Sequence, residues 1–301
     1  MEKGDTGMAN WNRNLPRLAL SALVVVAVGA CAGGSAEKGV LPDGAPHGEV
    51  VALEYDAARD RLLKAYPAAL YESADGGVSW NPIPLPGPGG DGRITAVAAS
   101  DSGRALYVAG RGIGVIRSTD AGQTWTSRAD GLPSRHVTAF AIHSDQPGTL
   151  YAAFAKEGIY RSEDAGARWK KMDGGPGAEI RQFLHSGMEG SMQTGWLFAA
   201  TPDGVRRSMD CFCGWRPAGK LPDGAVLDVA YDPMQPKRVY ASTDHGLFRS
   251  GDGGETWVRG SADPIAGALA VDRAGTLFSA ARDGTVLRSA DQGLSWEQSR
   301  A

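Results

Sequence analysis

The stretch "FRSGDGGETW" at residues 248–257 is one of six related segments in this chain. Five of them follow the pattern Ser-x-Asp-x-Gly-x-x-Trp, and the sixth, "RRSMDCFCGW" at residues 206–215, keeps the Ser, the Asp and the Trp. The serines of the six segments lie at positions 73, 118, 162, 208, 250 and 289, so the period runs from 39 to 46 residues. A period of this length indicates a repeat architecture.

Each period also carries short β-rich runs separated by turn residues. Ahead of "FRSGDGGETW" lie "VLDVAYD" (226–232) and "RVYAST" (238–243), then "GLFRS" (246–250), and Trp257 opens a fourth run. Four short strands in about 40 residues are typical of a propeller blade. Six segments with no leftover strand at either end predict an all-β, six-bladed β-propeller with four-stranded antiparallel blades.

The residue types of the repeated segment suit a hairpin between the third and fourth strands of a blade. The Asp can accept backbone N–H bonds within the turn, and the Gly allows a positive φ. The Trp can pack under the turn and fill the gap to the neighbouring blade, burying on the order of 200 Å². The residues expected in this structural role are Asp75, Trp80, Asp120, Trp125, Asp164, Trp169, Asp210, Trp215, Asp252, Trp257, Asp291 and Trp296.

With these segments the chain resembles the Asp-box (BNR-repeat) propellers, within the wider group of WD40/YVTN-like repeats. The resemblance extends over residues 47–301 and includes sialidases, sortilin-type receptor domains, xyloglucan-degrading enzymes and the photosystem II assembly factors. It implies the fold far more than the function, because in these families the box usually lies away from the working face.

The first thirty residues differ from the rest of the chain. Arg13 and Arg17 precede an apolar run at residues 18–30, which has the form of a signal peptide. Its end, "VGAC" at residues 28–31, resembles the bacterial lipobox. This resemblance implies removal of residues 1–30, lipidation of Cys31 and a flexible tether over residues 31–46. A plain secretion signal and an uncleaved anchor are the alternatives. We expect a lipoprotein of the bacterial cell envelope, facing the periplasm or on the cell surface.

The composition argues against several classes of function. The 301 residues carry a formal net charge of −3 and no basic stripe, so nucleic acid is not an expected partner. The chain has no P-loop and no Gly-x-Ser-x-Gly elbow. Its five histidines show no zinc spacing. We therefore predict no cofactor, no metal and no catalytic residue, in a monomeric protein.

One face of the predicted propeller collects the loops that join strands two and three and the loops that lead to the next blade. These loops carry a mixed ring of charged side chains around the channel. The candidate ligand-binding residues are Glu49, Arg93, His136, Glu179 and Arg181. Solvated loop charges are the alternative interpretation.

The segment "RRSMDCFCGW" departs from the pattern at Cys211 and Cys213. In an oxidising compartment these two residues could form a disulfide, which would fix a turn that has lost its glycine at position 212. A metal-binding pair and two free thiols are the alternatives.

These observations predict a non-catalytic binding or scaffolding module for an envelope protein or a glycan, held at the membrane by its lipid anchor. One alternative is a glycoside hydrolase of the exo-sialidase-like class. Against it, Arg93-Ile94-Thr95 lacks the proline of the sialidase Arg-Ile-Pro motif, and Tyr107, Tyr151 and Tyr240 repeat at one strand position. A further alternative is an assembly factor for a membrane complex.

Overall fold

The computed structural model describes residues 49–86, 92–100, 104–192, 194–222, 224–261, 267–281 and 283–299. All of these residues belong to the unit Lys38–Ala301. The predicted signal peptide, Cys31 and the whole of the predicted tether over residues 31–46 lie outside the described residues. In the part of the chain that the structure describes, no helix is long and apolar enough to cross a membrane.

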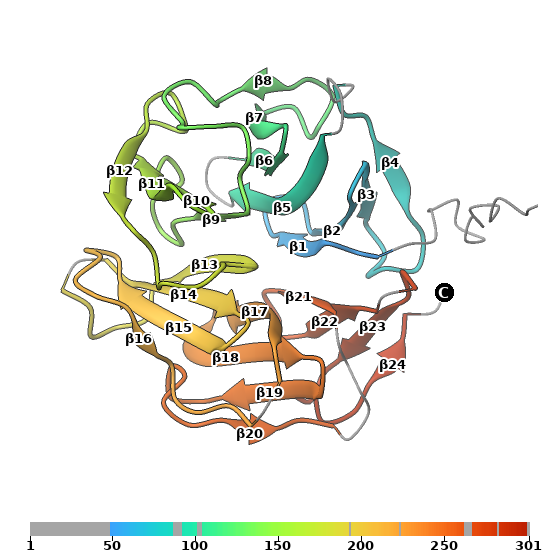
Figure 1. Ribbon diagram of the computed structural model, residues 1–301. Helices are drawn as coiled ribbons and strands as arrows, with labels where there is room; N and C mark the ends of the chain where they lie inside the picture. The colour runs from blue at the N-terminus through green and yellow to red at the C-terminus, as the bar shows by residue number, and fades with distance from the viewer. Residues whose placement is uncertain are drawn as a thin grey trace, which may run out of the picture. The chain divides into compact units, whose positions relative to one another are not determined.

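The described residues form six four-stranded antiparallel sheets, each built from four consecutive strands (Figure 1). The first two sheets contain β1 (Ala52–Asp56), β2 (Arg61–Tyr66), β3 (Ala69–Ser73) and β4 (Asn81–Ile83), then β5 (Arg93–Ser100), β6 (Ala105–Arg111), β7 (Gly114–Ser118) and β8 (Thr126–Ser127). The third and fourth contain β9 (Ala139–Ile142), β10 (Leu150–Phe154), β11 (Gly158–Ser162) and β12 (Lys170–Asp173), then β13 (Gln182–Ser186), β14 (Trp196–Thr201), β15 (Gly204–Met209) and β16 (Arg216–Pro217). The fifth and sixth contain β17 (Val226–Asp232), β18 (Gln235–Thr243), β19 (Gly246–Ser250) and β20 (Val258–Arg259), then β21 (Ala268–Val271), β22 (Leu277–Ala280), β23 (Val286–Ser289) and β24 (Glu297–Gln298).

The first strands of the six sheets surround the centre of the propeller (Figure 1). β1 lies beside β5, β5 beside β9, β9 beside β13, β13 beside β17 and β17 beside β21, and β21 returns to β1. The last blade meets the first through the Ser299 hydroxyl, 2.7 Å from the Gly76 carbonyl oxygen, and through Lys64 Nζ, 3.2 Å from the Gly284 carbonyl oxygen. The predicted six-bladed propeller is therefore confirmed.

The second strands of the blades are largely buried on both faces because each sheet packs between two neighbouring sheets. β10, with the sequence LYAAF, and β14, with the sequence WLFAAT, are buried at every position. Such strands read as continuous apolar runs instead of alternating ones. Tyr107, Tyr151 and Tyr240 are fully buried at equivalent positions of β6, β10 and β18, as expected for side chains that pack between blades.

The fifth Asp-box shows how a regular box closes its turn. Asp252 Oδ1 accepts hydrogen bonds from the Ser250 hydroxyl at 2.6 Å and from the Thr256 N–H at 2.9 Å. Its Oδ2 accepts from the Thr256 hydroxyl at 2.6 Å. The Gly254 N–H donates back to Ser250 Oγ at 2.8 Å, with a φ of 83° at Gly254. Trp257 Nε1 then donates to the Ala218 carbonyl oxygen, 2.7 Å away on the preceding blade.

The other regular boxes repeat this arrangement, with the box serine bonded to the box aspartate at 2.7–2.9 Å. The aspartates that accept this bond are Asp75, Asp120, Asp164 and Asp291. Burial opposes ionisation of Asp252, yet the hydrogen bonds from Ser250, Thr256 and Glu255 together lower its pKa to about 2. A regular box is thus an ionised carboxylate held by its own turn.

Candidate functional site

The five candidate ligand-binding residues are all exposed and lie where the chain enters a first strand. Glu49 precedes β1, Arg93 begins β5, His136 precedes β9, and Glu179 and Arg181 precede β13. The entries of successive first strands follow one another around the ring (Figure 1). The five residues therefore belong to four successive blades on one side of the propeller.

Arg111, at the end of β6, connects three of these blades. It pairs with Arg93 across the β5–β6 ladder and forms an isolated bridge with His136. Its Nη2 lies 3.6 Å from Glu179 Oε1, and both side chains are more than half exposed. We call Arg93, Arg111, His136 and Glu179 the Arg111 cluster. An exposed ion pair of this kind stabilises the fold by less than about 1 kcal/mol, so its members can exchange partners readily.

The remaining two candidates are not part of this cluster. Arg181 Nη1 donates to the Val226 carbonyl oxygen at 3.3 Å and thereby ties the fourth blade to the fifth. Within the described residues, Glu49 forms no hydrogen bond or ion pair with the other four candidates. The ring expected from the sequence is in this structure an arc over the second, third and fourth blades.

A central cavity of about 180 Å³ is lined by all six first strands. Glu54 lines it and accepts a hydrogen bond from the Ala99 N–H of the next blade at 3.2 Å. Asp228, buried beside the channel, accepts from the Leu269 N–H of the next blade at 2.7 Å. Burial raises the pKa of Asp228 to about 7. These two carboxylates join neighbouring blades through backbone amides.

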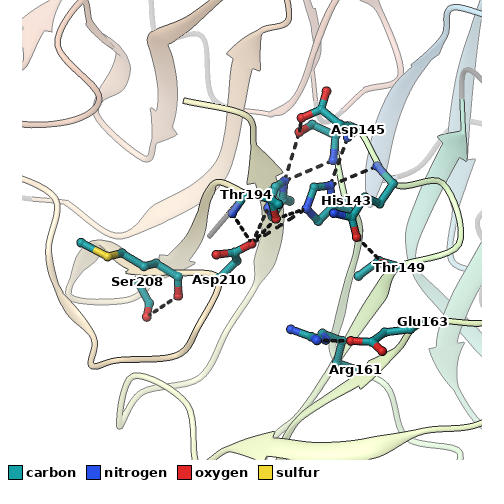
Figure 2. A network of polar contacts seen from close by, with 12 residues as sticks. His143, Asp145, Thr149, Arg161, Glu163, Thr194, Ser208 and Asp210 are labelled. Carbon is teal, nitrogen blue, oxygen red and sulfur yellow. Dashed lines mark hydrogen bonds and ion pairs between the residues drawn. The ribbon is translucent and has the colours of Figure 1, made fainter. Parts of the chain in front are cut away.

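The fourth Asp-box differs from the other five in where its carboxylate goes. Asp210 is 1% exposed. Its Oδ2 accepts hydrogen bonds from the hydroxyl and the backbone N–H of Thr194, on the loop between β13 and β14 (Figure 2). Ser208, the box serine, donates to the Met209 carbonyl oxygen instead of to Asp210. The residue before the Trp is Gly214, which has no hydroxyl to donate. The expectation that this Asp caps its own turn therefore fails.

Two histidines face the same carboxylate oxygen from the interface between the third and fourth blades. His143 Nε2 lies 3.9 Å and His185 Nε2 lies 3.8 Å from Asp210 Oδ2. His143 Nε2 is also 2.6 Å from the Thr194 hydroxyl oxygen (Figure 2). The two imidazole rings stack with 3.7 Å between their centroids. We call His143, His185, Thr194 and Asp210 the Asp210 pocket.

Backbone amides determine which nitrogen of each ring carries the proton. The N–H groups of Asp145 and Gln146 both point to His143 Nδ1, each at 3.1 Å, and the Ser144 N–H points to His185 Nδ1 at 3.1 Å. A backbone N–H can only donate, so each Nδ1 must present a lone pair. Each ring is then neutral with its proton on Nε2, directed at Asp210 and Thr194.

The fold explains why His143 has this orientation. Asp232 stands at the equivalent end of the first strand in the fifth blade, and its Oδ1 accepts from the N–H groups of Met234 and Gln235. In the third blade, His143 Nδ1 accepts the equivalent two hydrogen bonds, from the N–H groups of Asp145 and Gln146. The ring replaces a carboxylate that caps the loop between the first and second strands.

Among the described residues, the side chains that come close enough to share a metal ion are His143, His185 and Asp210. A metal-bound histidine normally coordinates through one nitrogen and donates an N–H from the other to an acceptor. Here the second nitrogen faces N–H donors, which is the reverse arrangement. The donor set therefore fits an anion, and Asp210 itself is that anion.

The electrostatics of the Asp210 pocket agree with this assignment. Burial opposes the charge of Asp210, yet the contacts with His185 and Thr194 lower its pKa to about 2. Burial, together with the neighbouring His185, lowers the pKa of His143 to about 4, although Asp210 acts in the opposite direction. The pocket therefore holds the ionised carboxylate of Asp210 against the neutral imidazole of His143 near neutral pH.

The turn that carries Asp210 is closed by a disulfide between Cys211 and Cys213, with 5.4 Å between their Cα atoms. Phe212 has a φ of 57°, in the left-handed region that regular boxes fill with glycine at this place. Its ring packs against Tyr151 of the third blade, with 6.1 Å between centroids.

The repeat pattern of the sequence does not predict the Asp210 pocket. His143 and His185 are 42 residues apart and lie outside the repeated box, so their proximity depends on the packing of two blades. The available signals were the missing glycine at Phe212 and the histidine at a position where the fifth blade has Asp232.

A family model described as photosynthesis system II assembly factor YCF48 matches residues 48–187. No curated protein matches the chain.

Several solved structures share the fold. A GH74 xyloglucanase from Xanthomonas campestris has a TM-score of 0.60 and 20% identity, over 83% of this chain and 47% of that one. The extracellular domain of a one-component system from B. thetaiotaomicron has a TM-score of 0.57 and 16% identity, over 84% and 33%. YCF48 bound to D1 peptide has a TM-score of 0.55 and 18% identity, over 84% and 82%.

The chain spans about half the length of the GH74 enzymes that it matches. At these identities the similarity shows the fold alone. Together with the box hairpins, the match to a BNR family model over residues 48–187 and the six closed blades, it shows that the chain has the fold of the Asp-box (BNR-repeat) β-propellers.

Proposed function

We propose that the chain is an extracytoplasmic, lipid-anchored propeller that binds a polypeptide segment of an envelope protein at the Arg111 cluster. The observation that carries this proposal is the contact between Arg111 and Glu179, which places exposed charges of both signs side by side on neighbouring blades. Such a surface can pair with the charged side chains and the backbone of an extended peptide. A propeller of similar extent, YCF48, has been solved with a peptide bound.

Glycoside hydrolysis is less well supported by the contacts of the channel. A glycosidase needs two carboxylates that are free to act on the sugar, one as acid and one as base or nucleophile. Glu54 and Asp228 are instead engaged by backbone amides of the next blade. This engagement favours a binding module over an enzyme.

Site-specific photo-crosslinking in cells tests the proposed surface. A photoreactive residue at position 111 or 179 should give adducts with one or a few envelope proteins. The control position is Arg168, which is 91% exposed in the third Asp-box and lies outside the Arg111 cluster. Equal adducts from position 168, or none from positions 111 and 179, would contradict the proposal. Turnover of a xyloglucan or a sialoside that is lost on changing Glu49 or Glu179 would also contradict it.

The lipid anchor is tested separately. Lipidation of Cys31 would hold the propeller at a membrane by acyl chains. Cys31→Ala should block labelling by a fatty-acid analogue and move the protein to the soluble fraction. An unchanged membrane fraction with full labelling would show that another feature holds the protein there.

A further inference from the structure

The turn of the fourth Asp-box places a large non-glycine residue, Phe212, in the left-handed region. Regular boxes place glycine at the residue where the fourth box has Phe212, and a non-glycine side chain is disfavoured at a φ of 57°. The disulfide from Cys211 to Cys213 spans this residue on both sides. The covalent link therefore holds Phe212 in a conformation that its own side chain opposes.

The carboxylate that precedes this turn is also poorly supported by charge. Asp210 is buried, and both facing imidazoles are neutral, so it has no cationic partner among the described residues of its pocket. Its Oδ1 has no hydrogen-bond partner there, and neither does His185 Nε2. The ionised carboxylate is therefore stabilised by the donors of Thr194 and the facing imidazoles, and it depends on their geometry. Asp210 directly precedes Cys211 in the chain. The geometry of the turn therefore determines whether the Asp210 carboxylate can stay in the pocket.

The disulfide is accessible to a nucleophile. Cys213 is exposed and Cys211 is partly exposed. A link across two positions closes a very small loop and so constrains the unfolded chain less than a long-range link does. Exposed disulfides of this kind are more easily reduced than buried structural ones. The main effect of the Cys211–Cys213 disulfide is therefore local, on the turn and on the position of Asp210.

We propose that Cys211–Cys213 is a thiol–disulfide exchange site, and that its reduction by a dithiol releases Asp210 from the pocket between the third and fourth blades. A thiolate of the dithiol attacks Cys213 Sγ, the bond between the two cysteine sulfurs breaks, and Cys211 leaves as a thiolate. The second thiol of the reagent then displaces Cys213. The two electrons and two protons of the dithiol end on the two cysteines, and the reagent becomes a cyclic disulfide.

Backbone amides report on this release. The N–H groups of Ser144, Asp145 and Gln146 are bonded to the two imidazole Nδ1 atoms, so their hydrogen exchange is slow only while the rings stay in place. The experiment compares amide exchange in the full chain before and after reduction with dithiothreitol. A peptide from the fifth Asp-box, residues 250–257, serves as the internal control.

We expect reduction to speed exchange at residues 144–146 by about tenfold or more, with the fifth box unchanged, as for a local opening. The double variant Cys211→Ser/Cys213→Ser should show the fast exchange without reductant and no response to it. Unchanged exchange at residues 144–146 after full reduction would overturn the proposal, as would an equal change in the fifth box.

Asp210→Asn tests whether the disulfide acts through the carboxylate. This variant should already exchange fast while oxidised, so reduction should change the rate less than about twofold, as expected for coupled neighbours. An undiminished response to reduction would overturn the link between Cys211–Cys213 and Asp210. If Asp210→Asn does not fold, the cysteine double variant still decides the result.

Discussion

The fifth and the fourth Asp-box have the same spacing from serine to tryptophan and use their aspartates differently. Asp252 is exposed and caps its own turn through Ser250 and Thr256. Asp210 is buried and bonds Thr194 of another loop. The missing hydroxyl before the Trp does not by itself explain this difference, because Asp164 caps its own turn in the third box, where Arg168 stands at that place. In the fourth box the carboxylate instead finds donors between two blades.

The largest expected effect concerns the feature that the two boxes share. Trp257 Nε1 bonds the Ala218 carbonyl oxygen at 2.7 Å, and Trp215 Nε1 bonds Asp173 Oδ1 at 2.8 Å, so both rings pack toward the preceding blade. Trp257→Ala and Trp215→Ala should each lower the free energy of unfolding by about 3–5 kcal/mol. Urea denaturation measures this. A loss under about 1 kcal/mol in either variant would mean that its ring does not hold the blades together.

The next effect is a pH dependence of the free energy of unfolding that arises beside the fourth box, at His143. The pKa of His143 is lowered by burial from 6.5 to about 4, with Asp210, Asp145 and Arg161 as charged neighbours. Below pH 6.5 the unfolded chain binds more protons than the folded one, so stability should fall as the pH drops from 6.5 to 4. The loss can reach about 3 kcal/mol. Urea titrations at several pH values measure it.

His143→Asn is the matched control for this pH dependence. Its side-chain oxygen can accept the loop amides that His143 Nδ1 accepts, and it does not titrate. Stability of the variant should be flatter between pH 6.5 and 4. An unchanged slope would assign the pH dependence to other groups.

A smaller effect is expected from making the two aspartates neutral. Asp210→Asn places N–H groups opposite the donors of His143, His185 and Thr194 and should cost about 2 kcal/mol. Asp252→Asn keeps one oxygen for the turn, so it should cost less than about 1 kcal/mol. Chemical denaturation of both variants, side by side, gives the difference. Equal losses would mean that burial of Asp210 has no energetic consequence.

The smallest effect concerns the serines. Ser250 Oγ donates to Asp252 and accepts from the Gly254 N–H, whereas Ser208 Oγ bonds only its neighbour's carbonyl oxygen. Ser250→Ala should cost about 1 kcal/mol and Ser208→Ala about half as much or less. Thermal unfolding of the two variants measures the order, and a reversed order would contradict the contacts described for the fourth box.

The fold could be predicted because its evidence is local and repeated. Five copies carry a carboxylate, a glycine and a tryptophan at fixed spacing, and the sixth keeps the carboxylate and the tryptophan. The positions of Arg93, His136 and Glu179 on one side also followed from the repeat, since each enters a first strand. Their contact with Arg111 did not, because it depends on side-chain directions across three blades.

The Asp210 pocket could not be predicted for a related reason. Its donors come from the third and fourth blades, and none belongs to the repeated pattern. The sequence did single out the fourth box through Cys211, Cys213 and the missing glycine. It could not show that the carboxylate turns inward, because that requires knowing that His143 and His185 stack beside it.

The fourth box holds the carboxylate of Asp210 against two neutral histidines, His143 and His185. Long-range ¹H–¹⁵N correlation spectra of the ¹⁵N-histidine-labelled chain at pH 7 test it most directly. We expect that His143 and His185 both carry their proton on Nε2 and that their resonances do not shift on addition of Zn²⁺. A proton on Nδ1, a charged imidazolium at either residue, or a shift of both resonances on zinc binding would contradict it.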